Sequence, residues 1–194
     1  MAYTHKFDVN DTWAFLCPVA LKCGEVNTKL ERLVLLDTGA GFCHISFPLW
    51  CFIGLNKVCF NEKKESLNLM GVHSPDDMTF DKLPFPPAAN KTELGNGLKI
   101  DTYEFRLDEL ILGTQASGAD NRIVLNNITV RIIDSPKYEF IVGLNVLRYL
   151  TINYQPSETQ SICQITFEDN GRRLLEKHRA KGINNMQRMF QYLQ

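Results

Sequence analysis

Residues 33–40 read Leu-Val-Leu-Leu-Asp-Thr-Gly-Ala, and this stretch decides how the rest of the chain is interpreted. Four consecutive apolar residues predict a buried strand, which ends directly at Asp37. Burial disfavours the ionised form of a carboxyl group, so an acid at this position has a free-energy cost that usually indicates a function. The alternative is an ordinary turn, because Asp can bond its own backbone and Gly permits a positive φ.

The following residues favour the functional interpretation. Residues 37–46, DTGAGFCHIS, resemble the active-site segment of retropepsin-like aspartic proteases, where Asp-Thr-Gly-Ala precedes an aliphatic residue and often a Ser. Residues 140–147, FIVGLNVL, resemble the hydrophobic-hydrophobic-Gly element of the same family. In that element two apolar residues pack under the catalytic loop, and the Gly lets a short helix start against it. Two motifs in the right order are more specific than one short match.

The resemblance covers about residues 12–168. It implies an all-β fold, a retropepsin-like half-barrel with one short helix after the Ile-Val-Gly element. Hydrophobic patterning agrees with this, since it predicts about seven strands and two short helices in a small, mostly antiparallel barrel-like fold. The main expected strands are at residues 13–21, 32–37, 98–107, 123–133 and 138–142.

We therefore expect a protease domain at residues 1–170 and a different kind of segment at residues 171–194. Apolar residues of this C-terminal extension recur at helical spacing, and Gly182 is expected to divide the helix in two. The extension has six Lys or Arg and one acid, a charge of +5, so residues 1–170 carry −6. A basic amphipathic helix packed on its own domain is expected, with a dimer contact or an anionic partner as the alternatives.

A chain of this length has room for one lobe, and it contains one Asp-Thr-Gly triplet. The near miss Asp134-Ser135-Pro136 has Pro in place of Gly and is interpreted as a turn. The resemblance therefore implies a symmetric homodimer that pairs Asp37 with its mate. Two such carboxylates share a proton, so that one acts as base and the other as acid on a water that attacks the peptide bond.

The neighbours of Asp37 receive roles from the same resemblance. Thr38 is expected to brace the two loops across the dimer, and Gly39 to permit close approach of the substrate. Ala40 is expected in the substrate-binding surface. Because alanine has no hydroxyl that could donate to the carboxylate and lower its pKa, we expect a working pH nearer neutral than that of stomach-type enzymes.

The family's flap, a hairpin that closes over the bound peptide, is expected in one of two stretches. The first choice is residues 69–73, which makes Met70, Gly71 and Val72 substrate-binding residues. The alternative is residues 94–98, whose Asn-Gly step is the stronger hairpin signal on turn chemistry alone. The Pro-rich stretch at residues 75–87 between them is expected to be an inserted loop.

Composition excludes several classes of protein. A net charge of −1 and a pI near 6.4 argue against a nucleic-acid partner. The six cysteines and four histidines lack metal-ligand spacing, so neither a metal nor another cofactor is expected. No secretory signal is recognised, and the longest apolar run, residues 47–55, is about half of the ~20 residues that a membrane span requires. Reduced thiols in a cytoplasmic protein are expected.

The sequence thus predicts an aspartic-type endopeptidase, a hydrolase that acts as a homodimer on a peptide or protein substrate. One alternative is a non-catalytic retropepsin-fold module for peptide binding or dimerisation. Another is a chain whose tail blocks or re-routes dimerisation, so that activity needs assembly with another chain. Cys43 followed by His44 could suggest a thiol nucleophile, but neighbours in a strand point to opposite faces, and packing is the expected role of both.

Overall fold

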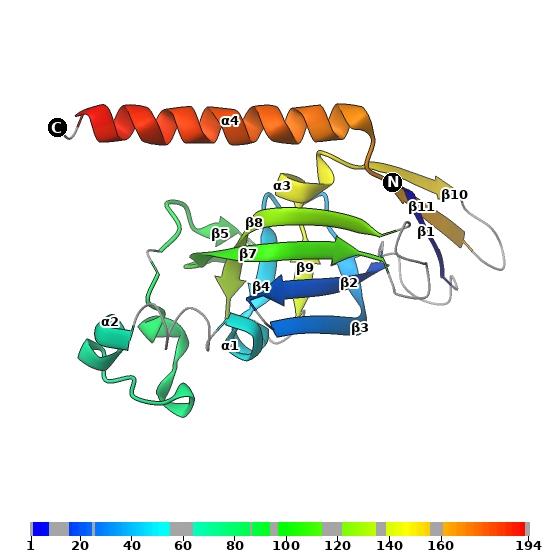
Figure 1. Cartoon of the computed structure of the whole chain (residues 1–194). Coiled ribbons are helices and arrows are strands. Elements are labelled where there is room, and N and C mark those ends of the chain that lie inside the picture. The colour runs from blue at the N-terminus through cyan, green and yellow to red at the C-terminus, as the bar shows by residue number, and fades with distance from the viewer. Residues whose placement is uncertain are drawn as a thin grey trace.

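The computed structural model describes residues 2–7, 16–24, 26–54, 64–85, 87–93, 97–113, 122–134, 139–155 and 161–192 (Figure 1). Its helices, strands and 3-10 turns (η) are, in chain order, β1 (Ala2–Phe7), β2 (Leu16–Cys23), β3 (Val26–Leu36), β4 (Cys43–Ser46), α1 (Phe47–Gly54), α2 (Lys64–Leu69), η2 (Pro75–Asp77), η3 (Phe80–Lys82), β5 (Thr92–Glu93), β6 (Lys99–Ile100), β7 (Tyr103–Leu112), β8 (Ile123–Ile133), β9 (Phe140–Val142), α3 (Leu144–Leu147), β10 (Thr151–Gln155), β11 (Ser161–Thr166) and α4 (Asp169–Tyr192).

Six strands curl into a barrel in the order β2-β3-β9-β4-β8-β7. The expectation of a mostly β fold with a curled sheet and few short helices is confirmed. Strand β8 illustrates the link between sequence and fold. It is rich in β-branched and apolar residues, which favour strands, and many of their side chains are buried in the core. Between Pro18 and Val19 the register of β2 on β3 shifts, which is the bulge that a proline within a strand predicts.

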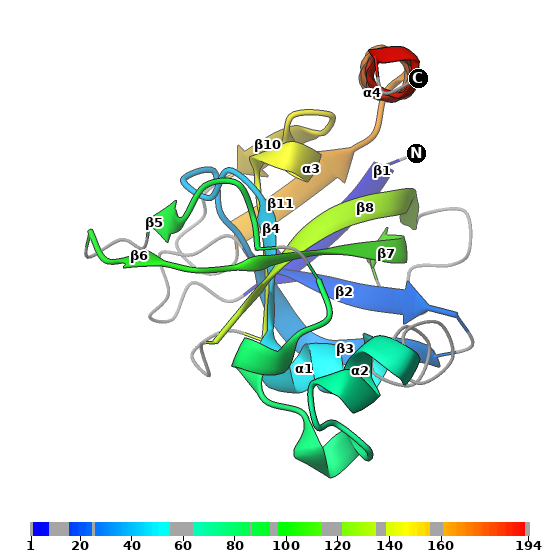
Figure 2. The ribbon, with the colours of Figure 1, turned by 90° about the vertical axis from the view of Figure 1, so that its left-hand side faces the viewer.

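Two smaller sheets flank the barrel. Strand β11 lies between β10 and β1 and is antiparallel to both, so segments from the two ends of the chain pair directly, with Ala2 opposite Thr166. Strands β5 and β6 form a separate two-stranded antiparallel hairpin. In Figure 2 this hairpin projects to the left of the barrel, whereas α4 lies above the barrel.

An aromatic cluster closes one side of the barrel. The Trp50 side chain of α1 is fully buried and makes edge contacts with Phe85 and Phe105. Phe80 likewise packs edge-on against Tyr103 of β7. These contacts hold much of the stretch at residues 75–87, expected as an inserted loop, in the two 3-10 turns η2 and η3.

The C-terminal segment is one helix, so the expected division at Gly182 is wrong. A glycine inside a helix costs about 1 kcal/mol relative to alanine, too little to end a helix of 24 residues. The first turns of α4 contact the body of the protein: Tyr149 Oη lies 2.9 Å from His178 Nδ1, and Arg179 donates to the Asn126 carbonyl. Beyond them α4 extends past the barrel (Figure 1). Among the described helices, none has both the length and the apolar character needed to cross a bilayer.

The hairpin expected at residues 69–73 is not formed, and that prediction is wrong. Helix α2 ends there, and Met70 and Gly71 make the turn that follows it, with Gly71 at a φ of 72°. The Val72 amide bonds the Leu67 carbonyl, and both side chains are fully buried, so helix packing decides this stretch. The observed hairpin, β5–β6, encloses the alternative stretch, of which residues 94–96 lie outside the described part of the chain.

Candidate active site

Asp37 follows directly after β3, and the loop of residues 37–42 leads into β4. These two strands do not pair with each other in the barrel, because β9 lies between them. Leu36 is in parallel register with Val142, and His44 is opposite Ile141 in antiparallel register. The loop must therefore cross the end of β9, and this crossing fixes the position of Asp37.

Backbone hydrogen bonds hold the loop at both ends of the crossing. The Asp37 amide donates to the Val142 carbonyl at 3.0 Å. Two amides at the start of α3 donate back to the loop, Leu144 to the Ala40 carbonyl at 2.7 Å and Asn145 to the Gly41 carbonyl at 3.1 Å. The otherwise unpaired amides of the helix start thereby become part of the support of the loop.

Gly143 allows this close approach. A Cβ at this position would lie 2.2 Å from the Phe42 carbonyl oxygen and 2.8 Å from that of Ala40. Both contacts are with backbone atoms that cannot rotate away. The glycine of the Ile-Val-Gly stretch is thus required by the packing of the loop, in agreement with the role that the sequence motif suggests.

Asn145, which the sequence analysis did not single out, connects three elements. Its Oδ1 accepts from the Cys43 amide at 2.8 Å, and its Nδ2 donates to the Thr129 carbonyl of β8 at 2.8 Å. The only sequence signal was an amide side chain two residues after Gly143. Its partners are distant in sequence, so no local pattern could have identified them.

The Asp37 carboxylate lies at the open side of the loop. It is half-buried, and its Oδ1 accepts the Gly39 amide at 2.8 Å, which fixes the orientation of the carboxyl group. Thr38 and Gly39 are exposed, whereas Ala40 is half-buried. The structure therefore brings these four predicted residues together on one loop and separates them from Met70, Gly71 and Val72 beyond α2.

Cys43 and His44 both pack in the interior, as expected. Burial raises the pKa of the Cys43 thiol to about 12, and its Sγ accepts the Gly143 amide at 3.4 Å. Burial also lowers the pKa of His44 to about 4; Arg131 lowers it further, and Asp37 acts in the opposite direction. At neutral pH the thiol is protonated and the imidazole is neutral, so this pair does not provide a thiolate nucleophile.

One row of side chains crosses the sheet beside Asp37. The register places Leu35, Ile141, His44, Arg131 and Glu104 opposite one another on β3, β9, β4, β8 and β7. Directly paired residues share one face of a sheet, and Leu35 and Asp37 alternate onto that same face. The row leads from the carboxylate toward the β5–β6 hairpin, which lies beside the loop in both views (Figures 1 and 2).

The hairpin has ion pairs at its surface and buried contacts at its base, where the hydroxyl oxygens of Thr92 and Thr102 lie 3.5 Å apart. Lys91 pairs with Asp101 at 3.1 Å and Lys99 with Glu93 at 3.8 Å, and all four side chains are more than half exposed. Near the tip, Leu98 is 56% exposed. Such ion pairs contribute little to stability, so the exposed side of the hairpin is held less firmly than the Asp37 loop.

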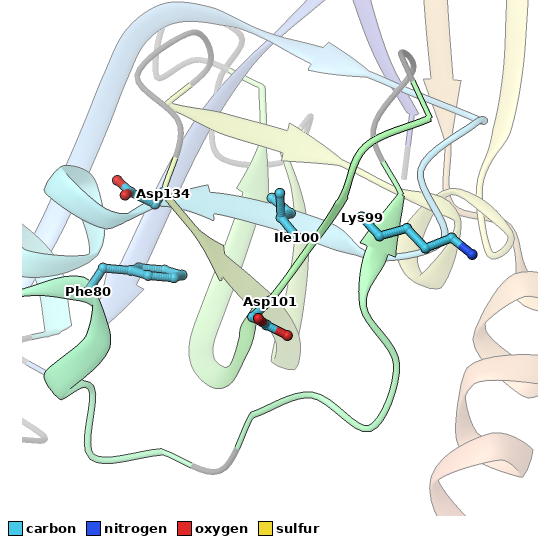
Figure 3. A pocket seen from close by; sticks show the side chains of 5 residues that line it. All are labelled: Phe80, Lys99, Ile100, Asp101 and Asp134. Atoms are coloured by element: carbon cyan, nitrogen blue, oxygen red, sulfur yellow. The ribbon is translucent and has the colours of Figure 1, made fainter.

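A hollow of about 390 Å³ adjoins the hairpin (Figure 3). It is lined by Phe80, Lys99, Ile100, Asp101 and Asp134. In Figure 3 the Lys99 side chain extends away from the other four. None of these residues belongs to the Asp37 loop. In the described part of the chain, no three His, Cys, Asp or Glu side chains gather closely enough to hold a metal ion.

Comparisons with known proteins find a likeness at the level of structure. No protein-family model matches the chain, and no curated protein sequence matches it significantly. Among solved structures, the chain is similar to a retropepsin-like aspartic protease from Rickettsia conorii, with a TM-score of 0.42 and 11% sequence identity over 84% of this chain and 92% of that one.

Proposed function

We propose that this chain is an aspartic endopeptidase of the retropepsin type, which forms its catalytic pair from Asp37 of two copies. The observation that supports it best is the Asp37 loop. A half-buried carboxylate is held by the Gly39 amide on a loop that backbone bonds fix to β9 and α3. Exposed Thr38 and Gly39 leave this side of the loop open to a second copy. A homodimer with two-fold symmetry would place the two carboxylates face to face.

In this arrangement the ionised carboxylate takes a proton from a water bound between the two acids. The water oxygen attacks the scissile carbonyl carbon, and the protonated carboxyl group gives its proton to the carbonyl oxygen. The tetrahedral diol then collapses: the carboxyl group that took the proton from the water gives it to the leaving nitrogen, the other carboxylate takes a proton from one hydroxyl of the diol, and the C–N bond breaks. A carboxylic acid and an amine are released, and the pair of carboxyl groups again shares one proton. The two carboxyl groups titrate as a coupled pair, because two nearby negative charges repel.

The β5–β6 hairpin is the proposed flap. It is the two-stranded hairpin beside the loop, and its exposed Leu98 is suited to contact with an apolar part of the substrate. An extended peptide between hairpin and loop would pair through its backbone, so that main-chain bonds supply affinity and side-chain contacts supply selectivity. Thr38 would brace the two loops, and Gly39 and Ala40 would line the floor beneath the peptide.

The proposal is tested with the full chain, a peptide library and two variants. Wild type is expected to cleave peptides, and Asp37→Asn to lose at least about a hundredfold in rate, the lower range for a general acid or base. The control is Asp76→Asn, which neutralises an exposed carboxylate in η2 and should leave the rate unchanged. Ala40 leads us to expect a pH optimum nearer neutral, and an optimum below about pH 3 would contradict that expectation.

Mixing tests whether two chains share one site. If subunits exchange freely, a ninefold excess of Asp37→Asn leaves about one wild-type chain in ten with a wild-type partner, so activity per wild-type chain falls about tenfold. Light scattering over a concentration series measures the dimer directly. Activity that is unaffected by the excess would contradict the shared site. A chain that cleaves no peptide at any pH would favour the module for peptide binding or dimerisation.

A further inference from the structure

Arg131 is a buried cation on the face of the sheet that carries Asp37. It lies near the C-terminal end of β8, between His44 of β4 and Glu104 of β7 in the register of the sheet, and only 8% of its surface is exposed. Taking a charge out of water costs several kcal/mol unless strong partners replace the hydration. An apolar side chain at this point of the strand would avoid that cost.

The partners of Arg131 replace its hydration incompletely. Its Nη2 lies 3.5 Å from a carboxylate oxygen of Glu104, whose side chain is 42% exposed, and its buried Nε has no hydrogen-bond partner among the described residues. The two hydrogen bonds of Nη1, to the Asn90 carbonyl at 3.4 Å and to Thr92 Oγ1 at 3.3 Å, are long. Barrel stability alone therefore gives a weak reason for an arginine here.

The contacts of Arg131 instead connect two parts of the candidate site. On one side it donates to Asn90 and Thr92, at the start of the β5–β6 hairpin. On the other side its guanidinium lies 4.0 Å from the centre of the Phe42 ring, a favourable cation–π distance. Phe42 belongs to the Asp37 loop, and its carbonyl lies against Gly143. One side chain thus touches both the hairpin and the loop.

We propose that Arg131 is a positioning residue that holds the β5–β6 hairpin in register with the Asp37 loop. Where the hairpin acts as the flap, a role that depends on the proposed function, Arg131 sets the distance between the flap and the catalytic carboxylate. The planar guanidinium suits this task because it can stack on a ring and donate from its edge at the same time. A lysine ammonium is a point charge that cannot do both.

Amide hydrogen exchange on the unliganded full chain tests the link without any need for activity. In Arg131→Met, amide exchange is expected to rise about tenfold in both the hairpin (residues 88–93 and 97–102) and the loop (residues 38–43), and to stay unchanged in β2 and β7. Arg131→Lys should give the same pattern. The control is Arg106→Met, which removes an exposed arginine from the neighbouring strand and should change neither segment.

Two further variants test the two contacts from their other ends, and they remain informative if Arg131→Met folds poorly. Thr92→Val keeps the shape of the side chain and removes the side-chain acceptor of the hairpin, leaving the Asn90 carbonyl, whereas Phe42→Leu removes the ring. Each should raise exchange alone and add little in the Arg131→Met background, because all remove the same link. A rise confined to one segment, a uniform rise through the barrel, additive effects or a wild-type pattern in Arg131→Lys would overturn the proposal.

Cleavage kinetics separate this proposal from the proposed function. In Arg131→Met, KM for a library-derived peptide is expected to rise about tenfold while kcat changes less than threefold, since the flap is misplaced and the carboxylates are retained. Unchanged KM together with loosened segments would overturn the positioning role and leave the peptidase intact. If wild type cleaves nothing, the peptidase fails, and the exchange experiment alone decides whether Arg131 links hairpin and loop.

Discussion

The Asp37 loop and the β5–β6 hairpin lie side by side, but they are held in opposite ways. The loop is fixed by backbone hydrogen bonds to β9 and α3 and by the contact at Gly143. The hairpin has exposed ion pairs at its surface, and at its base the buried Thr92 contacts Thr102 and Arg131. The proposed chemistry needs a fixed carboxylate, which the backbone bonds of the loop supply, whereas the surface contacts of the proposed flap can break at little cost.

The largest expected effect on stability comes from a substitution at Gly143 that prevents its close approach to the Asp37 loop. Gly143→Ala should lower the free energy of unfolding by about 3 kcal/mol, because the new methyl group meets backbone carbonyls at 2.2 and 2.8 Å. Gly41→Ala in the same loop is the matched control, since its Cβ would meet nothing within 4 Å, and it should change stability by less than about 0.5 kcal/mol. Denaturant titration measures both. Equal effects of the two substitutions would show that the loop is not held at Gly143.

Acid should lower the free energy of unfolding through His44, which is buried beside the loop. Its pKa is lowered to about 4 in the folded protein and is about 6.5 when the chain is unfolded, so the unfolded chain binds the proton first. The contribution of neutral His44 to the free energy of unfolding is therefore fully present above about pH 6.5. It falls toward pH 4, by up to about 1.4 kcal/mol per pH unit. His44→Gln should flatten this part of the stability–pH curve. An unchanged slope would mean that another group is responsible.

Asn145→Ala removes the side chain that joins the loop exit to β8. It should cost about 2 kcal/mol, because two hydrogen bonds of 2.8 Å are lost and the Cys43 amide is left without this acceptor. Asn153→Ala, at an exposed position of β10, is the control and should have little effect. Thermal unfolding of the two variants side by side gives the comparison. If Asn145→Ala is as stable as the control, the loop is held by its backbone alone.

The smallest effect is expected at the hairpin surface. Lys91→Ala breaks the exposed pair with Asp101 and should change stability by at most about 0.5 kcal/mol, an effect that added salt removes. Unfolding at low and high ionic strength measures it. A loss above about 1 kcal/mol that persists in high salt would remove the contrast between a loosely held hairpin and a fixed loop.

The sequence predicted the loop well because its determinants are local. An apolar strand ending in Asp-Thr-Gly and an apolar pair before a glycine are short patterns, and the structure places them next to each other at β3 and β9. The first choice for the flap, residues 69–73, was wrong because it too relied on a short local pattern. Gly71 after apolar residues looks like a turn tip, but the burial of Val72 against α2 is a tertiary effect that no short pattern contains.

Arg131 and Asn145 could not be identified from the sequence, because their partners are far away along the chain. The Arg131 bonds to Asn90 and Thr92 span 41 and 39 residues, and the Asn145 bond to Cys43 spans 102. An isolated arginine or asparagine in an apolar stretch has no periodic signal. The register of the barrel strands was needed to place these residues beside the loop.

The pairing of β1 with β11 has a consequence for how the protein is made. Residues 2–7 are translated more than 150 residues before their partner strand, residues 161–166. At ~5–20 residues per second, the first strand waits on the order of ten seconds for its partner. During that interval its unpaired edge is open to other chains in the cell. Slower elongation should therefore lower the yield of native protein, and shielding of the nascent N-terminal segment should restore it.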